Sequence, residues 1–130
     1  MSEDISSNSL AYLGDAVIEL LVRRSLVTDK VHLKNPSEEA VKYVNAAAQS
    51  DAYSKIEAHL TEDEADVYRR ARNNYHTSNV PKSATPAQYR RSTGFEAVFG
   101  YLYLRGDTGR IEELFNIAFG LEYKSERKEK

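Results

Sequence analysis

The strongest structural signal in this chain is LAYLGDAVIELLVRR, residues 10 to 24. Its apolar residues recur at three- and four-residue steps, which is the spacing of an α-helix that buries one face. The expected apolar stripe consists of Leu10, Leu13, Val17, Leu20 and Leu21. We expect the helix to begin after Ser7 or Asn8, because either side chain can accept a hydrogen bond from an early backbone N–H. It should end near Val27 and Thr28.

Helical spacing also governs the rest of the chain, where strand-like alternation of apolar and polar residues is weak. Asn35 before Pro36 predicts a second helical start. That segment runs to about Leu60, either unbroken or divided around Ser50 and Asp51. We therefore predict an all-α fold.

A long loop separates this part of the chain from its last helices. Thr61 and Glu64 form a capping box, which predicts a short helix to about Arg72. NNYHTSNVPKSA, residues 73 to 84, is polar and lacks helical spacing, so we expect a loop there. The later helices are expected to begin at Thr85 with Pro86 and at Asp107 or Thr108, with Gly106 ending the first of them.

Length and composition predict one domain. A chain of 130 residues can bury one core, so we expect a single domain over residues 1–130, with a frayed tail at about 124–130. With no cysteine, the chain has no disulfide, thiolate zinc site or cysteine nucleophile, which fits a cytoplasmic setting. An acidic start and charges throughout the first helix argue against a signal peptide and a membrane span.

Charge is unevenly distributed along the chain. Between Val67 and Phe95 there are six basic residues and no acid, which leaves 12 basic and 20 acidic residues elsewhere. Such asymmetry is typical of a nucleic-acid-binding face, although the same residues could lie on the solvated faces of helices. The candidate nucleic-acid contacts are Arg69, Arg70, Arg72, His76, Lys82, Arg90 and Arg91.

Two acids stand near glycines within apolar helical stretches: Asp15 follows Gly14, and Glu96 lies two residues after Gly94. Glycine inside a helix costs roughly 1 kcal/mol relative to alanine, and the usual reason for it is close approach of another backbone. If the two helices cross at these glycines, the acids lie side by side, where a divalent cation would stabilise them. The alternative is that each acid pairs with an arginine or faces solvent.

The neighbours of both acids are rich in oxygen and poor in nitrogen. One helix face carries Asn8, Ala11, Asp15 and Glu19, and it lies roughly opposite the apolar stripe. Glu19 is a candidate third ligand, one turn beyond Asp15. Oxygen ligands suit Mg²⁺ or Mn²⁺ better than zinc.

These segments resemble a known family. Residues 10 to 24 resemble the signature helix of the ribonuclease III catalytic domain, whose core is a Leu-Gly-Asp-Ala stretch. STGFEAVFGYLYLRGD, residues 92 to 107, resembles the second acidic helix of that family. TPAQYRRST, residues 85 to 93, is similar to the Mini-ribonuclease III branch. The resemblance covers about residues 8 to 119 and implies a helical endonuclease fold.

The resemblance places the metal-binding aspartate of the family on Asp15 and its metal-binding glutamate on Glu96. Three further acids of the standard pattern are replaced here by Asn8, Ala11 and Thr93. This departure is consistent with a reduced site in the Mini-ribonuclease III branch. The alternatives are a non-catalytic RNA-binding or ribosome-associated helical protein that retains the scaffold, and a helical protein-interaction module.

The implied activity is magnesium-dependent hydrolysis of double-stranded RNA that leaves 5′-phosphate and 3′-hydroxyl ends, with Mn²⁺ as a substitute. The implied substrate is the precursor of 23S ribosomal RNA, and a ribosomal protein is a candidate assistant. We also expect a homodimer, because cutting both strands of a duplex favours two sites related by a two-fold axis. The resemblance places Tyr12 at the interface between the two copies.

Overall fold

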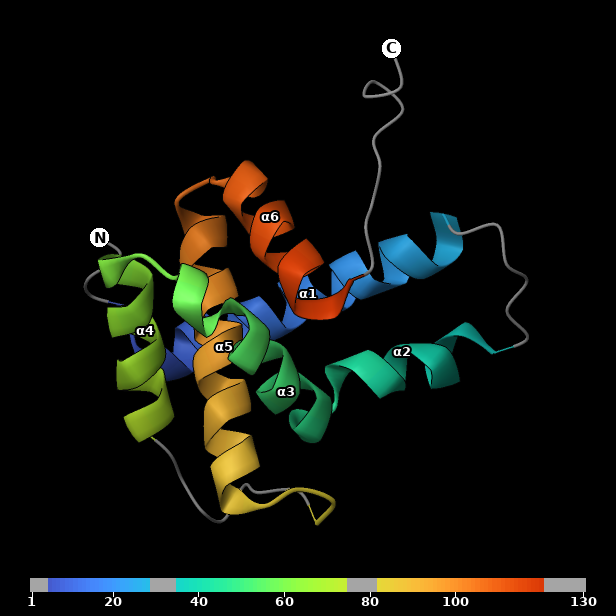
Figure 1. Ribbon diagram of the computed structural model, residues 1–130, viewed down its shortest axis with the longest axis horizontal. Coiled ribbons are helices and arrows are strands. Elements are labelled where there is room, and N and C mark those ends of the chain that lie inside the picture. The colour runs from blue at the N-terminus through green and yellow to red at the C-terminus, as the bar shows by residue number, and fades with distance from the viewer. Residues whose placement is uncertain (1–4, 29–34, 75–81, 121–130) are drawn as a thin grey trace.

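The computed structural model describes residues 5–28, 35–74 and 82–120, and their regular structure is entirely helical (Figure 1). The helices are α1 (Ser7–Thr28), α2 (Pro36–Val44), α3 (Ala46–Ile56), the short 3₁₀ helix η2 (Glu57–His59), α4 (Glu62–Asn73), α5 (Pro86–Leu104) and α6 (Thr108–Phe119). The predicted all-α fold is therefore confirmed. His76 and the predicted frayed tail lie outside the described residues. Within the described ranges, no helix is long and apolar enough to cross a membrane.

Side-chain caps set the helix boundaries. The predicted capping box is confirmed, since Glu64 N donates to Thr61 Oγ1 at 3.1 Å and Thr61 N donates to Glu64 Oε1 at 2.9 Å. The predicted cap of α1 was one or two residues late. Ser6 is the cap, because its Oγ accepts a hydrogen bond from Ser9 N at 3.1 Å.

The predicted break around Ser50 and Asp51 was wrong, because the break lies at Asn45. Asn45 Oδ1 accepts a hydrogen bond from Ala48 N at 2.8 Å, and Nδ2 donates to the carbonyl oxygen of Val41 at 2.9 Å. One short amide side chain thus caps the end of α2 and the start of α3, which is how asparagine competes with helical backbone bonds.

α5 runs across α1 in Figure 1, and the two backbones touch where they cross. A Cβ on Gly14 would overlap the carbonyl oxygen of Glu96, and a Cβ on Gly100 would overlap that of Leu10. The same built atom on Gly14 would lie 2.8 Å from Gly100 N. These two glycines therefore allow an approach that no larger residue permits.

The expected role of Gly94 in this crossing was wrong. Gly94 faces α4 instead, where a Cβ would lie 2.5 Å from a ring carbon of Tyr68. Both Gly94 and Gly100 lie in one apolar helix, and they face different neighbours because a separation of six residue steps turns the helix well past a full rotation.

The core lies among α1, α3, α5 and α6. Its fully buried side chains include Phe95, Phe99, Phe115, Ile18, Ile56, Leu114, Val22 and Val98. The predicted stripe of α1 is largely buried, but Leu20 is 66% exposed. Ile18 and Val22, both at 0% exposure, occupy the centre of the buried face in its place.

A buried ion pair joins the start of α4 to α6. Glu64 is 3% exposed, and Arg110 binds both of its oxygens, at 2.9 Å and 2.8 Å. Arg110 Nη2 also donates to the carbonyl oxygen of His59 at 2.6 Å. Burial on its own would raise the pKa of Glu64. The hydrogen bonds from Arg110 and Thr61 outweigh burial, so the pKa lies below its ordinary value of 4.5.

We expect Gly14→Ala and Gly100→Ala each to destabilise the fold by about 3 kcal/mol or more, because the added methyl group must push two backbones apart. Gly109→Ala is the matched control, since a Cβ there meets nothing within 4 Å. Urea unfolding followed by circular dichroism measures all three. If Gly14→Ala and Gly100→Ala were as stable as the wild type, the crossing would tolerate a wider spacing of the two helices.

We expect Glu64→Gln to lower the free energy of unfolding at neutral pH by about 3 kcal/mol, since it breaks a buried pair. A folded pKa below 4.5 means that the wild-type carboxylate stabilises the fold above that pH and loses this contribution as pH falls through the folded pKa. The difference in the free energy of unfolding between the wild type and Glu64→Gln should therefore become smaller at acid pH. Glu113→Gln, at a partner of Arg110 that is 60% exposed, should cost less than about 1 kcal/mol. Parallel pH profiles of wild type and Glu64→Gln would contradict this linkage.

Candidate metal centre

Asp15 on α1 and Glu96 on α5 lie side by side at the helix crossing. Gly14 contacts the backbone of Glu96, so the next residue of α1 comes close to the glutamate. The two carboxyl groups are within hydrogen-bonding contact. Asp15 is exposed and Glu96 is half-buried, so the pair has one open side. The juxtaposition predicted from the glycines is thus present, with Gly100 in the place of Gly94.

A negative charge on the Glu96 carboxyl is unfavourable in this position. Burial first, and then the negative charge and hydrogen bond of Asp15, raise the pKa of Glu96 well above its ordinary value of 4.5. A hydrogen bond from Gln49 acts in the opposite direction. Two adjacent carboxylates of this kind ionise together most readily when a cation lies against them.

Gln49 on α3 is a polar residue of this site that the sequence reasoning missed. Its side chain is 1% exposed and contacts the Glu96 carboxyl, while Nε2 donates to the carbonyl oxygen of Val44 at 3.1 Å. A signal for it exists in the sequence. Gln49 occupies the first position of the buried stripe of α3, three and four residues before Ala52 and Tyr53.

Arg91, predicted as an RNA contact, joins α5 to α3. Its Nε donates to Ser50 Oγ at 2.8 Å, and Nη2 donates to the carbonyl oxygen of Ser50 at 3.1 Å and to Ser54 Oγ at 2.6 Å. The guanidinium also lies 5.3 Å from the centre of the Tyr53 ring. These contacts hold α3 against α5 immediately beside Gln49.

A stack of aromatic rings continues this contact into α4. Tyr53 and Tyr68 are parallel, with ring centres 3.8 Å apart. The guanidinium carbon of Arg72 lies 5.6 Å from the centre of the Tyr68 ring, and both residues belong to α4. Two of the predicted RNA contacts, Arg72 and Arg91, therefore lie against a tyrosine pair inside the fold.

The other predicted site residues lie at the surface or outside the described part of the chain. Arg69 and Arg70 both pair with Asp66, and the Arg70 pair measures 3.0 Å. Lys82 is exposed and Arg90 is half-buried. Glu19 pairs with Arg23 at 3.1 Å. Among the described residues, no three histidine, aspartate or glutamate side chains gather closely enough to hold a metal ion, so Glu19 does not join the acid pair.

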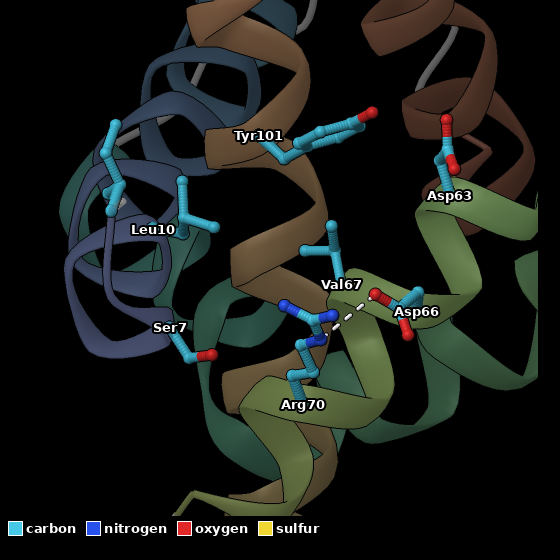
Figure 2. Close-up of a pocket in the computed structure, with 8 residues that line it drawn as sticks. Ser7, Leu10, Asp63, Asp66, Val67, Arg70 and Tyr101 are labelled. Carbon is cyan, nitrogen blue, oxygen red and sulfur yellow. Dashed lines mark ion pairs between the residues drawn. The ribbon is translucent and has the colours of Figure 1, made fainter. Parts of the chain in front are cut away.

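A cavity of about 300 Å³ lies between α1, α4 and α5 (Figure 2). Leu10, Val67 and Tyr101 form its apolar part, and Figure 2 shows the ion pair of Arg70 and Asp66 at its edge. None of its lining residues belongs to the acid pair or contacts it in the hydrogen bonds described above. The cavity is therefore separate from the candidate metal centre.

The donor set at the acid pair fits a hard divalent cation. Two carboxylates and a buried amide offer only oxygen, which Mg²⁺ and Mn²⁺ prefer. Mg²⁺ commonly keeps several water ligands, so one or two protein carboxylates suffice. The exposure of Asp15 leaves room for those waters.

Comparison with known proteins shows which family this chain is similar to. A family model described as Ribonuclease III domain matches residues 8–107. Mini-ribonuclease 3 of Symbiobacterium thermophilum is 46% identical over 111 residues, which are 85% of this chain and 85% of that protein. Mini-ribonuclease 3 of Streptococcus pneumoniae is 42% identical over 114 residues, covering 85% of this chain and 88% of that protein.

A solved structure shares the fold as well. The crystal structure of a protein from Fusobacterium nucleatum matches with a TM-score of 0.80 and 32% identity, over 90% of this chain and 93% of that chain. The matched family range includes α5 and all of α1 after its first residue, and the resemblance inferred from their motifs is confirmed. The chain therefore belongs to the ribonuclease III family and is an endoribonuclease.

Proposed function

We propose that this chain is a magnesium-dependent endoribonuclease of double-stranded RNA and that Asp15 and Glu96 hold the metal ion. The observation that carries the proposal is the contact between these two carboxyls at the glycine crossing of α1 and α5. Both residues lie inside the matched family range, at the positions where the resemblance expects metal-binding acids. Mn²⁺ would substitute, since it accepts the same oxygen ligands.

The two acids have different tasks in this proposal. Asp15 and Glu96 would hold the magnesium ion, which would supply an activated water for in-line attack on the phosphodiester and would offset charge on the phosphate. Glu96 is half-buried and contacted by Gln49, so it forms the fixed end of the pair. Asp15 is exposed and so is accessible to a phosphate arriving from solvent. The expected products carry 5′-phosphate and 3′-hydroxyl ends.

Basic side chains outside the tyrosine stack are the proposed RNA contacts. Arg69 and Arg70 are exposed, and surface ion pairs such as theirs contribute little stability, so they can exchange their partner for a phosphate. Contacts of this kind position a duplex without reading its sequence. The proposed set is Arg69, Arg70, Lys82 and Arg90, together with His76.

A second copy of the chain is the proposed partner of α1. Tyr12, Leu20 and Val27 are 84%, 66% and 70% exposed, and helical geometry places them on one side of the helix. A cluster of large exposed apolar side chains is typical of an interaction face. A two-fold pair of chains would present two acid pairs to the two strands of a duplex.

The proposed natural substrate is the precursor of 23S ribosomal RNA, as the resemblance to the Mini-ribonuclease III branch implies, with a ribosomal protein as a candidate assistant. A non-catalytic RNA-binding protein could share this fold and these basic residues. Cleavage of a long RNA duplex that requires added magnesium separates the two functions, because a binding protein would leave the duplex intact.

We expect Asp15→Asn and Glu96→Gln each to reduce cleavage of a long RNA duplex by more than about 100-fold, because loss of a direct ligand should exceed the effect of an outer contact. Their melting temperatures without metal should not fall, since each change removes a charge from a crowded pair. Glu19→Gln is the matched control and should cleave like the wild type at saturating magnesium, because Glu19 pairs with Arg23. Cleavage at the wild-type rate by both Asp15→Asn and Glu96→Gln would refute the proposed site.

For the proposed dimer, sedimentation equilibrium of the wild type should give about twice the chain mass of 14.7 kDa. We expect Tyr12→Asp to shift the mass toward one chain, because it places a charge in the apolar interface, and to abolish double-strand cleavage. Tyr103→Asp is the control, since Tyr103 is 53% exposed but lies on α5. A monomeric wild type that cuts both strands would overturn the dimer.

A further inference from the structure

We propose that Gln49 is a positioning residue of the metal centre: its carboxamide nitrogen fixes the Glu96 carboxylate, and its carboxamide oxygen accepts a hydrogen bond from a water on the bound ion. The inference rests on the proposed function, because it assumes that Asp15 and Glu96 hold the ion. Gln49 lies on α3, so the inference adds an uncharged polar group from a third helix to the carboxylates of α1 and α5.

The donor side of Gln49 is committed to the site. Nε2 donates to the carbonyl oxygen of Val44 at 3.1 Å, and the side chain lies within hydrogen-bonding reach of the Glu96 carboxyl, whose pKa it lowers. Val44 is the last residue of α2, where helical carbonyls lack partners within the helix. A primary amide has two N–H groups, so one nitrogen can serve both acceptors. The bond to α2 therefore orients the amide that contacts Glu96.

The acceptor side of Gln49 lacks a partner. Oε1 is buried, and no hydrogen-bond donor within the described residues reaches it. Such an atom costs free energy unless something in the functional state satisfies it. Oε1 and Nε2 share one carbon atom, so the unpartnered oxygen is held close to the carboxyl that Nε2 contacts. A water bound to a cation at that carboxylate is a strong donor of the kind that Oε1 lacks.

The position of Gln49 is held from its other side as well. The next residue, Ser50, accepts two hydrogen bonds from Arg91, which lies five residues before Glu96 on α5. Arg91 thus fixes the spacing of α3 and α5 where the amide reaches the carboxyl. Outer contacts that orient a metal ligand in this way commonly change metal affinity by 10- to 100-fold.

The test is Mn²⁺ binding to the full chain without RNA, followed by electron paramagnetic resonance, with melting temperatures measured in parallel. We expect Gln49→Met, which retains side-chain length but has no amide, to weaken Mn²⁺ affinity by about 10- to 100-fold. Ser50→Ala is the matched control: it removes one α3 to α5 hydrogen bond without touching Glu96, so it should lower the melting temperature and leave Mn²⁺ affinity unchanged.

A general packing role for Gln49 would give a different pattern, with a lower melting temperature and wild-type Mn²⁺ affinity, and that result would overturn the inference. If Gln49→Met does not melt cooperatively, Gln49→Asn repeats the titration with the amide withdrawn by one methylene. Failure of both variants to fold would also contradict the inference, because it would assign Gln49 to the fold alone. Wild-type chain that binds Mn²⁺ no better than Glu96→Gln would instead refute the proposed metal centre itself.

RNA cleavage gives a second readout. We expect Gln49→Met to need about 10- to 100-fold more magnesium for half-maximal cleavage and to recover most of the wild-type rate at saturating magnesium. A rate that stays low at every magnesium concentration would contradict a role in orienting a metal ligand.

Discussion

The direct contact between the backbones of α1 and α5 is the constraint on which the rest of the structure depends. It requires glycine on both helices, at Gly14 and Gly100. Because Gly14 and Asp15 are adjacent in sequence, the packing contact and the acid pair cannot be separated. A wider crossing would move the Asp15 backbone away from Glu96 and open the core beneath. The short distance between the backbones of α1 and α5 therefore determines both the packing of the core and the position of the acid pair.

Three helices contribute to the candidate centre, and each is held by a different kind of contact. α1 meets α5 through glycine, whereas α3 meets α5 through the hydrogen bonds of Arg91 and its stacking on Tyr53. The end of α2 is tied to α3 by the amides of Asn45 and Gln49, which donate to the carbonyl oxygens of Val41 and Val44. Directional hydrogen bonds, rather than apolar packing alone, therefore fix where the Glu96 carboxyl lies.

Sequence patterns predicted the helical elements and the acid pair, because period, caps and glycines near acids are local signals. The pairing of Gly100 rather than Gly94 with Gly14 could not be predicted, since both glycines suit a close approach and only the neighbouring helices distinguish them. The break at Asn45 was missed because asparagine can cap a helix or lie within one. Arg91 illustrates a broader limit. A basic run shows where positive charge lies in the sequence, but not whether a guanidinium faces inward.

The crowded acid pair implies a trade-off between stability and activity. Glu96 is held in a half-buried position beside another acid, where its negative charge is disfavoured. Selection for thermal stability alone would remove one of these carboxyls, as it commonly removes strained polar groups from functional sites. Variants recovered from a screen for heat resistance should therefore be enriched in neutral residues at Asp15 or Glu96, and under the proposed function these variants would not cleave RNA.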